Sequence, residues 1–238
     1  MGSTPDPEEI AAVSDARERV LSAVAGACAR TGRDPATVQL VAVSKTVPAA
    51  RLASAVAAGL TVLGENRLQE AESKAPLLPG ASWHLIGPLQ SNKARRAVEL
   101  FDVIESVDSV ELARRLDRLA GELGKAPLDV YLQANVDRDA AKAGFLPDDL
   151  EAELPALGAL PNLRLLGLMT VGRLVASPEE ARPTFLRLRE LSEWLRRAVP
   201  GLGAGLSMGM TDDYAVAVEE GATVIRVGRA LFGARQAG

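Results

Sequence analysis

The chain has 238 residues, of which 47% are hydrophobic and 24% are charged, the ordinary balance of a globular protein with a substantial core. A net charge of −4 and only 3% aromatic residues argue against a nucleic-acid-binding protein, which usually has a basic surplus and aromatic stacking platforms. The single cysteine, Cys28, and the single histidine, His84, exclude an internal disulfide and a thiolate–imidazole metal cluster. Because the sequence shows neither a membrane-length apolar stretch nor a signal-peptide layout, we expect a cytoplasmic protein that does not bind membranes.

Read from the N-terminus, the chain alternates between strand-like and helical segments after one long helix. We expect a disordered stub at 1–7 and a helix over 8–31, where apolar residues recur near helical spacing. The expected strands are 38–45, 61–66, 82–87, 102–107, 128–136, 163–171, 205–210 and 223–228. The expected helices between them are 48–59, 67–75, 91–101, 108–123, 147–160, 177–199 and 211–221.

Three of these helices begin at residues with capping side chains. Asp108 is followed three residues later by Glu111, and Ser177 by Glu180, the spacing of a capping box. Thr211 precedes the short helix that ends at Gly221. We therefore expect Asp108, Ser177 and Thr211 to be N-caps.

Eight strands that alternate with helices at βαβ spacing require parallel pairing and right-handed crossovers. An open doubly wound sheet could use the same pattern. A closed (β/α)8 barrel fits better, because the strand count is eight and such barrels take about 250 residues. No linker or composition break divides the chain, so we predict an α/β fold: one TIM barrel domain over 1–238 with an additional N-terminal helix.

Barrel enzymes have their sites at the carboxyl ends of the strands, where polar residues and glycines gather in this sequence. Lys45 ends the first strand. It either reaches into solvent along its flexible stem or lies in a pocket where desolvation leaves a free amine that can react with a carbonyl. Gly209 and Gly228 lie in the loops after strands seven and eight, which barrels often use for phosphate, although both could simply make tight turns. Together these features suggest a ligand with a phosphate and an aldehyde.

Six motifs, in order from Val38 to the C-terminus, carry a resemblance to a known family: "AVSKTVP", "LGENRLQE", "WHLIGPLQSNK", "GLMTV", "LSMGMTDDYAVAVEEGATVIRVG" and "ALFG". They resemble the pyridoxal 5′-phosphate (PLP) homeostasis proteins, which are barrels similar to the N-terminal domain of alanine racemase. The resemblance implies that Lys45 carries PLP covalently as a Schiff base and that Arg226 faces the pyridine nitrogen. It implies that the other cofactor contacts are Asn66, Met169, Ser207, Gly209, Gly228 and Arg229.

Two positions depart from the family pattern. The family usually has Thr or Ser where this chain has Arg229, so a hydroxyl contact to the phosphate is lost, and whether the guanidinium replaces it stays open. The segment "KAGF" at 142–145 is a loose version of the usual "KSG". Lys142 and Lys93 are interpreted as solvated surface lysines, although the "NK" at 92–93 belongs to a family motif and could assist cofactor transfer.

The resemblance leaves structural alternatives for two of these residues and gives none of them a catalytic role. Arg226 could be a barrel-interior residue paired with Glu65 or Glu105, and Asn66 could cap the helix that follows it. His84 is interpreted as a hydrogen-bonded core residue, and no metal site is expected.

An arginine beside the ring nitrogen would keep that nitrogen unprotonated, which makes the ring a weak electron sink and disfavours transamination. Racemases of similar fold use a second domain that delivers a tyrosine base, and neither Tyr131 nor Tyr214 is clearly placed for this task. We therefore expect a monomeric, non-catalytic PLP carrier that stores, buffers or delivers the cofactor, with apo PLP-dependent enzymes as partners. The alternatives are a PLP-dependent racemase or decarboxylase and an aldolase that uses Lys45 directly.

Overall fold

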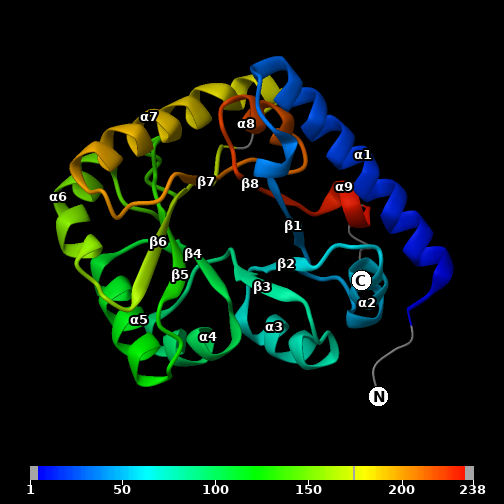
Figure 1. Cartoon of the computed structure of the whole chain (residues 1–238), viewed down its shortest axis with the longest axis horizontal. Helices are drawn as coiled ribbons and strands as arrows, with labels where there is room; N and C mark the ends of the chain where they lie inside the picture. Colours follow the sequence, from blue (N-terminus) through cyan, green and yellow to red (C-terminus); the bar gives the residue numbers. More distant parts are fainter. Residues whose placement is uncertain (1–4, 174, 234–238) are drawn as a thin grey trace.

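The computed structural model describes residues 5–173 and 175–233, and its centre is a closed barrel of eight parallel strands in chain order (Figure 1). The strands are β1 (Gln39–Val43), β2 (Val62–Glu65), β3 (Ser82–Leu85), β4 (Val103–Val107), β5 (Leu128–Gln133), β6 (Leu163–Met169), β7 (Gly205–Ser207) and β8 (Val224–Val227). Ala42 of β1 pairs with Leu63 on one side and with Val227 on the other, so the first and last strands close the ring. The predicted TIM barrel is confirmed.

Helices surround the barrel, as the alternating sequence pattern predicts. They are α1 (Pro7–Thr31), α2 (Ala49–Ala57), α3 (Leu68–Lys74), α4 (Ala94–Leu100), α5 (Val110–Glu122), α6 (Pro147–Gly158), α7 (Arg182–Ala198), α8 (Tyr214–Glu219) and α9 (Arg229–Phe232). Short 3₁₀ turns occupy Pro35–Thr37, Ala75–Leu77, Ser91–Lys93 and Pro178–Ala181. The strands are shorter than predicted because their polar ends leave the ladder to form the loops at the barrel mouth. No helix among the described residues is long and apolar enough to cross a lipid bilayer.

The additional N-terminal helix, α1, packs against α2, α8 and α9, across the join between β1 and β8 (Figure 1). Its apolar face is buried at Val13, Val20 and Val24. Asp6 caps the helix by accepting a hydrogen bond from the Glu8 amide at 3.0 Å, so α1 begins one residue earlier than predicted. Most of the stub that we expected to be disordered, residues 1–4, lies outside the described residues.

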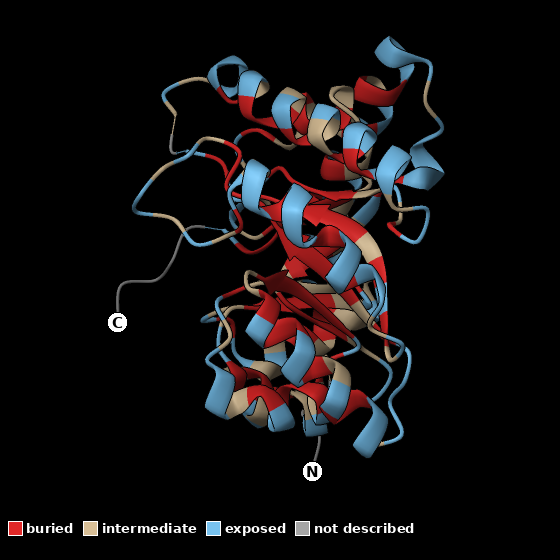
Figure 2. Cartoon of the chain, turned by 90° about the vertical axis from the view of Figure 1, so that its left-hand side faces the viewer, coloured by how far each residue is buried: buried red, intermediate tan, exposed pale blue. Residues whose placement is uncertain are grey.

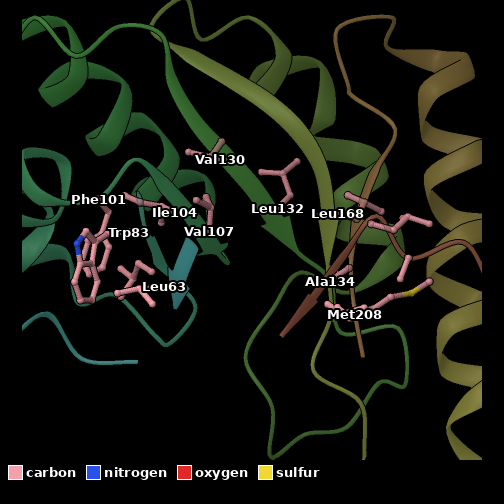
Figure 3. Close-up of a cluster of buried hydrophobic side chains, with 14 of the residues drawn as sticks. Leu63, Trp83, Phe101, Ile104, Val107, Val130, Leu132, Ala134, Leu168 and Met208 are labelled. Atoms are coloured by element: carbon pink, nitrogen blue, oxygen red, sulfur yellow. The ribbon is translucent and has the colours of Figure 1, made fainter. Parts of the chain in front are cut away.

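Two apolar clusters separate the two faces of the strands. The larger one fills the space between strands and helices, and Figure 3 shows part of it, including Leu63, Ile104 and Leu168. The smaller cluster comprises Val41, Val103, Tyr131, Met169 and Val224. Its members alternate along the strands with residues of the larger cluster, which places them on the inner face of the barrel. Figure 2 accordingly shows buried strands between helices whose outer faces are exposed.

Two of the predicted N-caps are wrong, and one helix starts differently from the prediction. Ser109 caps α5 in place of Asp108, because its hydroxyl accepts from the Leu112 amide at 3.3 Å. Asp213 precedes α8, while Thr211 lies in the loop before it. Ser177 precedes a 3₁₀ turn and donates its hydroxyl to Glu180 at 2.9 Å, and the α-helix proper starts at Arg182.

Candidate functional site

Lys45 lies two residues beyond the end of β1, at the mouth of the barrel, and is half-buried. The next residue, Thr46, has a φ of 64°, in the left-handed region that β-branched residues rarely adopt. Backbone outliers of this kind cluster at functional sites, where the surrounding structure holds them in place. The strand end that carries Lys45 is therefore held in a specific, strained conformation.

The residue before Lys45 is fixed to the neighbouring strand. Ser44 is fully buried, and its amide donates to the Gly64 carbonyl at 2.9 Å. Its hydroxyl lies 2.9 Å from Glu65 Oε1 and 3.1 Å from the same Gly64 carbonyl. Glu65 is also fully buried, so its carboxylate requires hydrogen-bond donors.

Lys74 on α3 supplies the positive charge for this buried carboxylate. Its ammonium donates to Glu65 Oε1 at 2.6 Å, to the Ser44 carbonyl at 2.9 Å and to Glu70 Oε2 at 3.3 Å. Glu70 Oε2 also accepts from the Thr46 amide at 2.9 Å. Burial raises the pKa of Glu70, but the hydrogen bonds from Thr46 and Lys74 outweigh it and leave this pKa below its usual value.

Arg226 lies inside the barrel on β8, and its side chain is only 4% exposed. Its Nη1 donates to Ser207 Oγ at 2.5 Å and its Nη2 donates to the Thr170 carbonyl at 2.7 Å. Burial lowers the pKa of the guanidinium, and the negative charges of Glu105 and Asp213 oppose this effect. Glu65, one of the two partners that we considered for Arg226, pairs instead with Lys74.

Glu105 on β4 is the counter-charge within reach of Arg226, with 3.8 Å between Oε2 and Nη1. The Ser207 hydroxyl bridges the two groups by donating to Glu105 Oε2 at 2.5 Å. His84 Nδ1 lies 2.7 Å from Glu105 Oε1 and donates to it, since an ionised carboxylate only accepts. Burial raises the pKa of Glu105, but hydrogen bonding and charge from His84, with contributions from Arg226 and Ser207, hold it below its usual range.

The loops after β7 and β8 meet at the opposite side of the mouth from β3 to β5. Gly209 has a φ of 91°, and a Cβ there would lie 2.6 Å from the Cβ of Ala217, so only glycine fits. Gly228 is half-buried, and its amide reaches Thr211 Oγ1 at 3.4 Å. Thr211, which we expected to cap a helix, thus brings a hydroxyl between the two loops.

Arg229, the residue at which the chain departs from the expected pattern, is exposed and forms an ion pair with Asp212. This pair joins the β8 loop to the β7 loop at the surface. The guanidinium is therefore held by a carboxylate of the neighbouring loop.

Asn66 directly follows β2 and is half-buried, and Arg67, not Asn66, occupies the N-cap position of α3. Asn66 borders a cavity of about 700 Å³ whose lining is Asn66, Arg67, Leu68, Gln69, Leu85, Pro88, Leu89, Gln90 and Lys93. Met169 ends β6 and belongs to the apolar cluster inside the barrel. The structure thus brings the predicted residues to one end of the barrel, but Met169, Ser207 and Arg226 lie inside it and the others at its rim.

Lys142 differs from the solvated surface residue that we expected. It is half-buried, and its ammonium donates to the Val171 carbonyl at 2.9 Å. Burial lowers its pKa, while Asp137 and Asp139 act in the opposite direction.

Comparison with known proteins identifies the family. The sequence profile of the alanine racemase N-terminal domain matches residues 27–236. A protein from Pseudomonas aeruginosa named pyridoxal phosphate homeostasis protein is 47% identical over 222 residues, which are 92% of this chain and 94% of that protein. The chain belongs to the pyridoxal phosphate homeostasis protein family. Among solved structures similar to this family member are two of PipY from Synechococcus elongatus.

The two PipY structures differ in their ligand. The structure without PLP is 50% identical in sequence, covers 87% of this chain and 97% of PipY, and has a TM-score of 0.80. The structure with PLP bound is 48% identical, covers 88% of this chain and all of the other chain, and has a TM-score of 0.78. This member of the pyridoxal phosphate homeostasis protein family therefore shares its fold with a protein that has been seen with PLP.

Sequence reasoning missed the role of Lys74 altogether and treated Glu70 only as part of a motif. The one local signal was their spacing, since residues four apart on a helix face each other. Glu105 was considered as a partner of Arg226, but its second partner, His84, was not foreseen.

Proposed function

We propose that this chain binds PLP at the barrel mouth, holds it covalently through Lys45 and serves PLP homeostasis by storing, buffering or delivering the cofactor. The observation that carries the proposal is the arrangement of the mouth: a lysine on the tightly held end of β1, beside β8 and the glycine-containing loops that follow β7 and β8. PLP bound to PipY at 48% identity supports the same assignment.

The residues present fit the cofactor. Gly209 lets the loop after β7 pack closely against α8, and the Gly228 amide and Thr211 hydroxyl are hydrogen-bond donors of the kind that a phosphate requires. Thr211 supplies a hydroxyl that Arg229 does not. Because the Ser207 hydroxyl already contacts Glu105 and Arg226, we assign Ser207 to the ring end of the site, below the phosphate.

Bound there, PLP supplies an aldehyde with which a lysine amine condenses, forming a carbon–nitrogen double bond and releasing one water. Lys45 provides the amine at the mouth. Arg226, a guanidinium that keeps its proton at ordinary pH, offers only hydrogen-bond donors to the group above it. A ring nitrogen that faces it receives no proton, which favours holding the cofactor over using it for catalysis.

The two tyrosines give no second base at the mouth. Tyr131 is buried in the apolar cluster inside the barrel, and burial, together with the charge of Glu105, raises the pKa of its hydroxyl. Tyr214 is half-buried on α8, where burial raises its pKa as well. Neither hydroxyl is suited to remove a proton from a bound amino acid at neutral pH.

An absorbance titration with PLP, followed by borohydride reduction and mass spectrometry, tests the proposal. We expect a yellow complex and, after reduction, a stable adduct on Lys45. Lys45→Ala should lose the visible band, while Lys125→Ala, which changes an exposed lysine beyond the carboxyl end of α5, should keep it. A colourless wild-type protein would contradict the proposal and favour an aldolase.

Incubation of the loaded protein with single amino acids tests the carrier assignment. A carrier leaves the optical rotation of each amino acid unchanged, whereas rapid loss of rotation would identify a racemase. The proposal also includes a monomer in the cytoplasm, and size-exclusion chromatography tests the oligomeric state. It further includes transfer of PLP to an apo PLP-dependent enzyme, which recovery of that enzyme's activity would measure.

A further inference from the structure

The side chain of Lys74 has no role in the proposed chemistry, yet it is the one buried lysine among the residues that the structure describes. It is 8% exposed and surrounded by oxygen atoms of Ser44, Glu65 and Glu70. A lysine is rarely buried unless it is paired. Each of the three partners of Lys74 contacts, or is itself, a residue next to Lys45 in the chain.

On the N-terminal side of Lys45, Lys74 fixes Ser44 by two routes. It donates directly to the Ser44 carbonyl at 2.9 Å, and through Glu65 it holds the carboxylate that accepts from the Ser44 hydroxyl. The peptide unit that joins Ser44 to Lys45 is thus anchored by an ammonium and, indirectly, by a buried carboxylate.

On the C-terminal side, Lys74 acts through Glu70. Glu70 Oε2 accepts from Lys74 at 3.3 Å and from the Thr46 amide at 2.9 Å. The Thr46 amide is part of the peptide unit that follows Lys45, and Thr46 is the residue in the left-handed conformation. The Glu70 carboxylate therefore holds the strained turn from which the Lys45 side chain projects.

We propose that Lys74 and Glu70 are positioning residues that fix the backbone on both sides of Lys45 and so keep its amine aimed at the cofactor aldehyde. The inference rests on the proposed function. A reacting amine that is held in place reacts as if at a much higher concentration, and supporting hydrogen bonds determine this precision. Neither residue touches the cofactor in this account.

Two ligands separate positioning from a merely structural role. PLP carries the aldehyde that Lys45 attacks, whereas pyridoxine 5′-phosphate has the same ring and phosphate with an alcohol in its place. Loss of positioning weakens binding of PLP alone. General damage to the mouth weakens the binding of both ligands.

The test compares dissociation constants of the two ligands for wild type, Glu70→Ala, Glu70→Gln and Glu72→Ala. Glu72→Ala is the matched control, because it removes a carboxylate from the same helix that pairs with Arg96 and not with the Lys45 turn. We expect Glu70→Ala to bind PLP about tenfold more weakly, the value of one hydrogen bond to a charged group. Its affinity for pyridoxine 5′-phosphate should be unchanged. Glu70→Gln keeps an acceptor for the Thr46 amide and should recover most of the PLP affinity.

Lys74 is tested by the double variant Lys74→Met/Glu65→Gln, which leaves no unpaired buried charge, with circular dichroism as the check that the barrel is folded. It should also lose PLP affinity selectively and shift the visible absorption band of the complex. Equal affinities of wild type and Glu70→Ala for PLP, or parallel losses for both ligands, would overturn the inference. A wild type that forms no borohydride-stable adduct on Lys45 would overturn the proposed function itself, so reduction and mass spectrometry of the wild type precede the comparison of variants.

Discussion

Glu105→Gln tests whether one buried carboxylate neutralises Arg226 inside the barrel. Glu105 is fully buried, and Arg226 Nη1 lies 3.8 Å from its Oε2, with the Ser207 hydroxyl between them. Removing one partner of a buried ion pair typically costs about 3–5 kcal/mol, because the remaining charge loses its partner; here the negative charge of Asp213 still acts on Arg226. The indirect contact favours the lower end, about 3 kcal/mol. In a chain of this size each kcal/mol lowers the melting temperature by about 2–4 °C, so we expect a decrease of about 6–12 °C.

Thermal unfolding followed by circular dichroism measures this effect, and a double-mutant cycle isolates it. Arg226→Gln removes the opposite charge, and the double variant leaves neither ion in the barrel. We expect the double variant to be more stable than the sum of the two single effects predicts, with a coupling of about 2 kcal/mol. If the two losses simply add, or if Glu105→Gln melts within 2 °C of wild type (roughly the effect of less than 1 kcal/mol), Glu105 does not neutralise Arg226.

Three further predictions concern the mouth and its charges. Thr46→Gly should raise the melting temperature by about 2–4 °C, because relief of left-handed strain exceeds the entropic cost of glycine by about 1 kcal/mol; a lower melting temperature would show that Thr46 is not strained. Gly209→Ala should cost about 2–3 kcal/mol and weaken PLP binding, since its φ of 91° and the 2.6 Å approach of Ala217 leave no room for a Cβ, whereas Gly201→Ala, with open space around it, should be neutral in both assays. The stability that Glu105 contributes should be fully present above its usual pKa of 4.5 and lost as the pH falls through its lower folded-state pKa. The urea midpoint of Glu105→Gln should therefore decline less than that of wild type below pH 4.5. Parallel declines of the two midpoints would contradict this.

Much of the barrel could be predicted from the sequence because each strand is a short apolar run bounded by loop residues. The mouth could be predicted for the same reason, since parallel strands bring residues such as Lys45 and Gly209 to one end whatever the details of packing. Helix starts were less predictable. Asp108 and Ser109 are adjacent and both able to cap, and only the backbone conformation decides between them.

The partners of the site residues were beyond sequence reasoning because they come from different strands and helices. Lys74 reaches Ser44 only because α3 lies beside the end of β1, and nothing near either residue encodes that contact. Ser207 resembles a phosphate-loop residue in the sequence. In the structure its hydroxyl faces inward and links Arg226 to Glu105.

The packing of α1 against α2, α8 and α9 has a consequence for synthesis of the chain. A ribosome completes α1 first, but the elements that cover much of its apolar side belong to the last twenty or so residues of the barrel. Until β8 joins β1, α8 and α9 are not in place beside this helix and the ring is an open sheet with two free edges. The emerging polypeptide is therefore exposed to misassociation until β8 has been made, because this strand seals the ring and completes the surface on which α1 docks.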